Sequence, residues 1–348
     1  MSDKCNKSMV WYSIFLGVLA MALMLYYNLN KEIEMKVEPQ KVEEPQVEHI
    51  GIDGVYDDLY ESKNLQKPLT ITLPSAEVAQ QAVLLEKYSE FCVQLIFEDI
   101  PKGYFYDTPL TGDVDGIKDI VCQYQDGKTI LSIYLNDVLA HIQKVKDREI
   151  TLQFKPLRQV YDKVVVIDPG HGGEDAGVMH GDVYEKDITL SVALKLKEML
   201  EKTDIKVLCT RLEDETISNQ MRTNLANAVN ADLFLNMHCG FDEKNESSHG
   251  IATYYNDTFF IPDFGNADFA YIVEEHVVRS ISGSSLGVAA GEVDNELLKH
   301  SMVPTAWVEM GYVSNENERG LLQQEEYVNK LAYGLYSAIV RSYEQMME

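Results

Sequence analysis

From Lys163 onward, short apolar runs alternate with longer stretches in which apolar residues recur every three or four positions. The apolar runs are typical of buried strands and the amphipathic stretches of helices that cover a sheet. We expect strands at 164–167, 206–210 and 232–237, and helices at 187–202, 219–230 and 325–343. Two successive βα units predict an α/β fold with a mainly parallel sheet flanked by helices, in a catalytic domain at residues 162–348.

The preceding segment, residues 50–161, has a different pattern, with short alternating runs such as Val93–Phe97 and Ile133–Leu135. Asp126-Gly127 separates two such runs as the turn of a tight hairpin does. The stretch from Ser75 to Glu90 is expected to form one helix. The pattern indicates a small β-rich domain, and its role cannot be inferred from any chemical motif.

The N-terminal segment Met9–Tyr27 contains no charged residue. At about 1.5 Å per residue, a helix of this length spans roughly 30 Å of hydrocarbon, so we predict a transmembrane helix at 9–27. A cleaved signal peptide is the alternative. Lys4 and Lys7 place the tail 1–8 in the cytosol. An acidic Pro/Glu linker follows at 28–49, and the expected location is the cell membrane, single-pass, with an extracytoplasmic catalytic domain.

The net charge of −26 argues against nucleic acid and anionic lipid surfaces as ligands, since both would be repelled. The alternative explanation of this charge is that an acidic surface only keeps the protein soluble. The five cysteines are too scattered for a disulfide framework or a Cys-rich zinc module. A disulfide between Cys92 and Cys122 is one possibility that the sequence allows.

The loop after the first strand reads DPGHGGEDAG, from Asp168 to Gly177, with His171 near its centre. In an open α/β sheet, ligands bind beyond the carboxyl ends of the strands, which is where this loop falls. A phosphate-binding loop or a plain tight turn are the alternatives. A phosphate loop would open a helix directly behind its glycines and would usually carry Lys. The pattern favours a functional histidine.

A second histidine, His238, ends the third strand in the sequence NMHCG, and Glu185 lies in Tyr184-Glu185-Lys186-Asp187, the segment that opens the first helix. Together His171, Glu185 and His238 form a His/Glu/His set, with a fourth position left for water. Three protein ligands of this kind are typical of a catalytic rather than a structural zinc site. The other histidines, His180, His249, His276 and His300, have no motif, and Cys239 should face away from His238 on the strand.

Glu309 lies within the apolar run TAWVEMGYVSN, where a carboxylate is costly unless it has a task or a partner. A hydrolytic zinc site needs a proton acceptor beside its water, and Glu309 is the candidate. The structural alternative is a buried ion pair with Arg211 or Arg222. Otherwise these two arginines are expected to pair with internal acids.

Several motifs occur in one order along the chain: DPGHGGEDAG, YEKD, Thr210-Arg211, NMHCG, Leu286-Gly287-Val288 and VEMGYVSNENE. In this order they resemble the zinc-dependent N-acetylmuramoyl-L-alanine amidases of the amidase-3 type, over about 164–343. The resemblance implies Zn²⁺ held by His171, Glu185 and His238, with Glu309 as the catalytic glutamate. Two positions depart from the family pattern: Cys239-Gly240, where Asn often follows a small residue, and Ala289-Ala290, where Arg is common.

The resulting hypothesis is a membrane-anchored peptidoglycan hydrolase that cleaves the amide between N-acetylmuramic acid and the L-Ala of the stem peptide, using zinc-activated water. One alternative is a catalytically silent cell-wall-binding scaffold with an amidase fold. Another is a zinc peptidase that acts on the stem peptide. The expected partners are peptidoglycan and, through the N-terminal helix, the membrane; no nucleic acid is expected, and the sequence identifies no regulatory protein.

Overall fold

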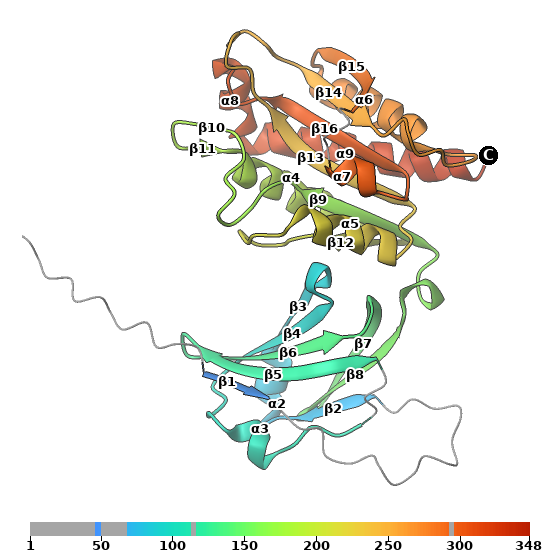
Figure 1. Cartoon of the computed structure of the whole chain (residues 1–348). Coiled ribbons are helices and arrows are strands. Elements are labelled where there is room, and N and C mark those ends of the chain that lie inside the picture. The colour runs from blue at the N-terminus through green and yellow to red at the C-terminus, as the bar shows by residue number, and fades with distance from the viewer. Residues whose placement is uncertain (1–45, 50–67, 113–115, 292–295) are drawn as a thin grey trace, which may run out of the picture. The chain divides into compact units, whose positions relative to one another are not determined.

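The apolar runs of the C-terminal half form the centre of a six-stranded sheet in the computed structural model of the chain (Figure 1). The structure describes residues 46–49, 68–112, 116–291 and 296–348. The strands of this sheet are, in spatial order, β12 (Ile205–Cys209), β9 (Lys163–Pro169), β13 (Leu233–Gly240), β16 (Thr305–Tyr312), β14 (Ile251–Tyr255) and β15 (Ser285–Ala290). The first four are parallel, β14 is antiparallel to β16, and β15 is parallel to β14. The α/β fold is confirmed, with a mixed sheet.

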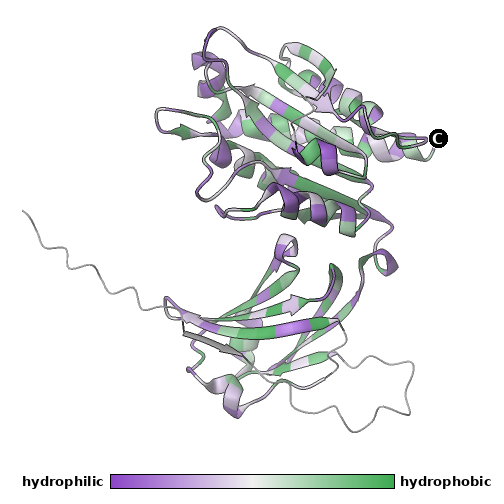
Figure 2. Ribbon diagram, in the orientation of Figure 1, coloured by the Kyte–Doolittle hydropathy of each residue, from purple (hydrophilic) through white to green (hydrophobic). Residues whose placement is uncertain are grey.

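The helices of this α/β region, residues 163–348, cover both faces of the sheet. They are α4 (Glu185–Leu200), α5 (Asn219–Ala228), α6 (Asn266–Ile281), α7 (Glu296–His300), α8 (Glu316–Leu322) and α9 (Glu325–Met346). Successive residues of β9 show why both faces are covered: Val165 and Ile167 pack against α4, α6 and α9, whereas Val164 and Val166 pack toward α5 and α7. Figure 2 shows the hydrophobic residues gathered along the strands of this sheet.

The β-rich region, residues 68–159, contains short helical segments and two sheets, one of which also includes a strand at residues 46–49. Its strands are β2 (Leu69–Thr72), β3 (Val83–Lys87), β4 (Cys92–Glu98), β5 (Ile117–Gln125), β6 (Lys128–Leu135), β7 (Leu139–Lys146) and β8 (Glu149–Pro156). The sheet orders are β1-β5-β6-β4-β3, where β1 is Gln46–His49, and β2-β8-β7. The short helical segments are α2 (Ala76–Gln81), η1 (Tyr88–Glu90), α3 (Tyr104–Asp107) and η2 (Leu157–Gln159). The predicted boundaries between domains stay predictions.

Two local predictions in this region have different outcomes. The hairpin is confirmed: Asp126 (φ 49°) and Gly127 (φ 77°) connect β5 and β6, and both have the positive φ that a tight hairpin turn requires. The single helix from Ser75 to Glu90 is wrong beyond Gln81. Residues 83–87 instead form β3, which pairs antiparallel with β4, and this pairing supplies the backbone hydrogen bonds that a helix would otherwise have made.

The possible bridge between Cys92 and Cys122 is not formed. Cys92 lies on β4 and Cys122 on β5, with β6 between them, and both side chains are buried. The two thiols therefore contribute to packing in the core of the β-rich region.

The predicted location as a single-pass membrane protein must be corrected. In the described part of the chain, no helix is both long and apolar enough to cross a membrane. The 22-residue α9 has the length, but it carries Glu325, Lys330 and Arg341, and charges at bilayer depth are costly. The segment 9–27, predicted as the transmembrane helix, lies outside the described residues, as do the tail 1–8 and most of the linker 28–49.

Candidate metal centre

His171 lies in the loop that follows β9, which we call the His171 loop (residues 170–177). The backbone of His171 itself is left-handed, with φ 61°, which is a strained conformation for a residue with a side chain. Two buried arginines hold the chain in this shape. Arg211 donates to the carbonyls of Pro169 and Gly170, both at 2.9 Å, and Arg222 donates to the carbonyl of His171 at 2.7 Å.

Glu185 is the first residue of α4, and only 1% of it is exposed. Its Oε1 accepts from the backbone N–H of Cys239 at 2.8 Å and lies 2.9 Å from Nδ1 of His238. Its Oε2 accepts from the backbone N–H of Val178 at 2.8 Å and lies 3.1 Å from Nε2 of His171. Glu185 therefore lies between the two histidines, with each carboxylate oxygen aimed at one of them.

His238 comes from the end of β13 and is 6% exposed. Its ring stacks on the indole of Trp307, on the neighbouring strand β16, with 3.5 Å between centroids and 5° between planes. A Cβ added to Gly170 would lie 2.2 Å from Cε1 of His238, so only glycine fits between the His171 loop and this ring. Stacking and close backbone contact fix the ring of His238 on two sides.

Nitrogen and oxygen atoms of His171, Glu185 and His238 all lie within 4.8 Å of one another, and no other such group of three is found in the described ranges. Two imidazoles and one carboxylate are a donor set that catalytic zinc sites use. The rings of His171 and His238 stand edge to face, at 82° and 4.9 Å, so their nitrogens can converge. The residues present therefore fit Zn²⁺.

Asp175 is a contributor to the site that the sequence did not indicate. Its Oδ2 lies 2.8 Å from Nδ1 of His171, which leaves Nε2 of that ring directed to Glu185. A carboxylate on the second ring nitrogen fixes the tautomer of a metal-binding histidine and its orientation. The four-residue spacing in HGGED was visible in the sequence, but only the turn geometry of the loop brings the two side chains together.

Glu309 lies on β16 in direct register with His238 on β13. In a parallel pair, residues in register point to the same face, so both side chains share one face of the sheet. A Cβ added to Gly240 would lie 3.0 Å from Oε2 of Glu309, so the missing side chain leaves this carboxylate its space.

The predicted alternative for Glu309, an ion pair with Arg211 or Arg222, is wrong. Among the described residues, Arg222 pairs with Asp168 at the end of β9, and Arg211 binds main-chain carbonyls. Arg222 thus pairs with an internal acid as expected. Arg211 does not, because the carbonyls of the His171 loop take its donors.

The two glutamates have opposite electrostatic environments. Burial alone would raise the pKa of Glu185, but hydrogen bonds from His171 and His238 outweigh it and hold this pKa well below its ordinary value. Burial and the charge of Glu185 raise the pKa of Glu309 to about 7. The site thus has one firmly ionised carboxylate and one whose proton exchanges near neutral pH.

The remaining candidates lie elsewhere. Cys239 faces the core packed against α4 and α9, and burial raises the pKa of its thiol well above the ordinary value. His180 and His249 are exposed, His300 pairs with Glu296, and none of these belongs to the three-residue cluster.

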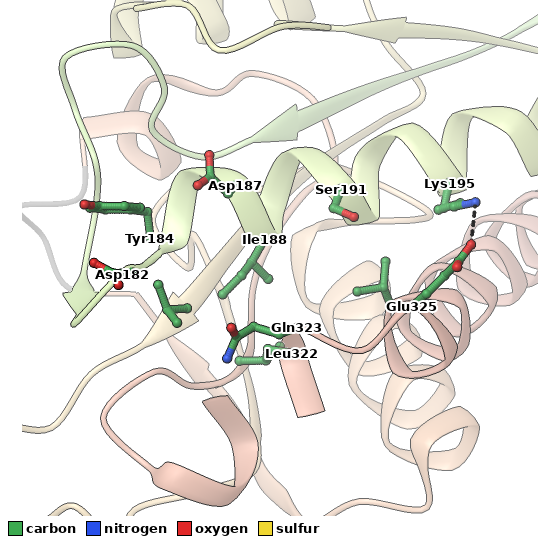
Figure 3. Close-up of a pocket in the computed structure, with 11 residues that line it drawn as sticks. Asp182, Tyr184, Asp187, Ile188, Ser191, Lys195, Leu322, Gln323 and Glu325 are labelled. Carbon is green, nitrogen blue, oxygen red and sulfur yellow. Dashed lines mark hydrogen bonds and ion pairs between the residues drawn. The ribbon is translucent and has the colours of Figure 1, made fainter. Parts of the chain in front are cut away.

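A groove of about 530 Å³ runs along α4 beside the start of α9 (Figure 3). Tyr184 and Asp187, on either side of Glu185 in the sequence, line it together with Leu322, and Lys195 forms an ion pair with Glu325 at its far end. The three clustered donors do not line this groove. It is a neighbouring depression and not the candidate metal centre itself.

Comparison with known proteins gives one consistent result. The family model described as N-acetylmuramoyl-L-alanine amidase matches residues 165–341. The N-acetylmuramoyl-L-alanine amidase CwlM of Bacillus licheniformis is 30% identical over 183 residues, covering 51% of this chain and 68% of that protein. The germination-specific N-acetylmuramoyl-L-alanine amidase of Bacillus subtilis (strain 168) is 26% identical over 198 residues, 53% of this chain and 81% of that protein. Among solved structures, an N-acetylmuramoyl-L-alanine amidase from Clostridium difficile 630 is 30% identical, with a TM-score of 0.49 and coverage of 52% and 97%.

Proposed function

We propose, because the chain belongs to the N-acetylmuramoyl-L-alanine amidase family, that its α/β region hydrolyses the amide between N-acetylmuramic acid and L-alanine in peptidoglycan. The family resemblance inferred from the ordered motifs is confirmed. Zinc dependence is a general property of this family. For this chain, zinc binding and the roles of individual residues are part of the proposal.

The observation that carries the proposal is the convergence of His171, Glu185 and His238 within 4.8 Å, with Glu309 in register beside His238. The three clustered side chains would hold Zn²⁺. When bound there, Zn²⁺ would supply polarisation of the scissile carbonyl and a more acidic water. Asp175 and Trp307 keep the two imidazoles in their orientations.

Glu309 is proposed as the general base and acid. Its carboxylate takes a proton from the attacking water as the new C–O bond forms, and returns that proton to the L-alanine nitrogen as the C–N bond breaks. In the metal-free chain the pKa of Glu309 is raised to about 7, so its carboxyl group can both accept and release a proton near neutral pH. A cation bound beside it would lower this pKa and favour the carboxylate that accepts the proton of water. No covalent bond to the protein is needed.

The test is digestion of purified peptidoglycan by the full chain, with the new amino termini identified by mass spectrometry. New L-alanine termini support the amidase. New termini at other residues would instead indicate a zinc peptidase, and no new termini a silent wall-binding protein. Loss of activity on chelation, with recovery on adding Zn²⁺, tests the metal.

A further inference from the structure

The His171 loop rests on a second loop, residues 211–218, which we call the supporting loop. The backbone N–H of Gly173 donates to Oδ1 of Asp214 at 2.7 Å, and that of Glu174 donates to Oγ1 of Thr216 at 3.0 Å. Lys186 also binds the His171 loop here, because its Nζ donates to the carbonyl of Gly173 at 2.9 Å. The shape of the His171 loop therefore depends on where the supporting loop lies.

The two loops also meet backbone to backbone. A Cβ added to Gly172 would lie 2.4 Å from the carbonyl oxygen of Glu215, and one added to Gly173 would lie 2.2 Å from Oγ1 of Thr216. Gly172 directly follows His171 in the chain. Because the two backbones are in close contact, a displacement of Glu215 would also displace Gly172 and, with it, the backbone of His171.

The side chain of Glu215 is held from the β-rich region. Its Oε2 lies 2.5 Å from Nζ of Lys87, the last residue of β3, and the two side chains are only 21% and 15% exposed. Burial would lower the pKa of Lys87, but Glu215 outweighs it and raises this pKa. An ion pair at this degree of burial is screened less by solvent than a surface pair.

Lys87 is itself anchored. The next residue, Tyr88, is 2% exposed and packs in one hydrophobic cluster with Leu208 and Leu225 of the α/β region. The residue before it, Glu86, forms an ion pair with Lys206 at 2.9 Å. The residues on both sides of Lys87 therefore contact the α/β region.

We propose that the β-rich region positions the metal-binding loop of this chain, with Lys87 and Glu215 as positioning residues for His171. The inference rests on the proposed function, since it assumes that His171 binds Zn²⁺. It gives the β-rich region a role in the metal centre, which no motif in its sequence indicated.

The test compares two paired variants of the full chain by their Zn²⁺ affinity, measured by competition with a chromogenic chelator. Lys87→Met with Glu215→Gln removes the proposed contact without leaving an unpaired charge. Arg158→Met with Asp232→Asn is the control, because it removes another partly buried ion pair between the β-rich and α/β regions, one that neither anchors Lys87 nor touches the supporting loop.

The expected result is a Zn²⁺ dissociation constant raised about three- to tenfold in the first variant and less than twofold in the control, since outer-shell changes at metal sites cost about 10–100-fold and this contact lies further out. The exchanged pair, Lys87→Glu with Glu215→Lys, should return the constant to within twofold of the natural chain. Equal weakening in both variants would overturn the proposal, as would unchanged affinity in the first, or an exchanged pair that folds without restoring affinity. A natural chain that binds no Zn²⁺ would overturn the proposed function itself.

Discussion

Replacing Glu309 with Gln tests separately what this residue contributes to catalysis and how much its charge lowers the free energy of unfolding. The pKa of Glu309 is raised from 4.5 to about 7, first by burial and then by the charge of Glu185. Gln has nearly the same shape and no charge. We expect Glu309→Gln to lower kcat roughly 10²–10⁴-fold and, at alkaline pH, to stabilise the metal-free chain.

The stability effect follows from proton linkage. Between pH 4.5 and about 7 the folded chain holds the Glu309 proton that the unfolded chain has lost, so the free energy of unfolding falls as pH rises through this window. The difference in pKa, 7 − 4.5, is about 2.5, and at 1.36 kcal/mol for each pKa unit it corresponds to about 3 kcal/mol. Solvent screening of a half-buried group reduces this to about 2 kcal/mol.

The assay is urea unfolding of the natural chain and Glu309→Gln at pH 5 and pH 8, with EDTA present because a bound cation would lower the pKa of Glu309. The variant should gain about 2 kcal/mol at pH 8 and well under 1 kcal/mol at pH 5. With Zn²⁺ restored, its kcat on peptidoglycan should fall roughly 10²–10⁴-fold. Glu316→Gln, at the exposed start of α8, is the matched control and should change neither quantity. A Glu309→Gln protein that keeps more than a tenth of the activity, or shows the same stability change at both pH values, would refute the reasoning.

Three further predictions concern the groups that hold the histidines. Asp175→Asn should weaken Zn²⁺ binding roughly 10–100-fold in a chelator competition, because Nδ1 of His171 loses its carboxylate; unchanged affinity would exclude this role. Arg222→Met should destabilise the chain by about 3–5 kcal/mol in urea unfolding, because it leaves Asp168 buried and unpaired, and adding Asp168→Asn should recover part of the loss. Gly170→Ala should reduce Zn²⁺ affinity more than Gly181→Ala, since only at residue 170 would the methyl group meet the His238 ring.

Much of the α/β fold could be predicted because its strands are continuous apolar runs. Val164–Ile167 is buried on both faces, and such a run is typical of a central parallel strand. Helix α6 was missed although Phe269, Val273 and Val277 recur at helical spacing within it. Strand β14 and the edge strand β15 were missed for a physical reason: they are short, and β14 forms by pairing with β16, which is distant in sequence.

The candidate site could be predicted in its chemistry but not in its geometry. His171 and His238 stood at strand ends, and ligands bind beyond the carboxyl ends of parallel strands. The stacking of Trp307 on His238 depends on the register between β13 and β16, which the sequence does not fix. Likewise, the hydrogen bond from Arg222 to the carbonyl of His171 depends on how α5, which carries Arg222, packs against the His171 loop.

Glu185 and Glu309 show how one residue type acquires two roles at a single site. The Glu185 carboxylate accepts backbone N–H groups of Val178 and Cys239 and faces both histidines, so it is ionised and suited to bind a cation. Glu309 has burial and the negative charge of Glu185 as the causes of its raised pKa, so it exchanges a proton near pH 7. Because the charge of Glu185 adds to burial in raising the pKa of Glu309, Glu185→Gln should remove part of this rise in the metal-free chain. Glu185 therefore has a second effect beyond metal binding, because its charge helps to set the pKa of Glu309. Neither role can be assigned from the position of a glutamate in the sequence alone.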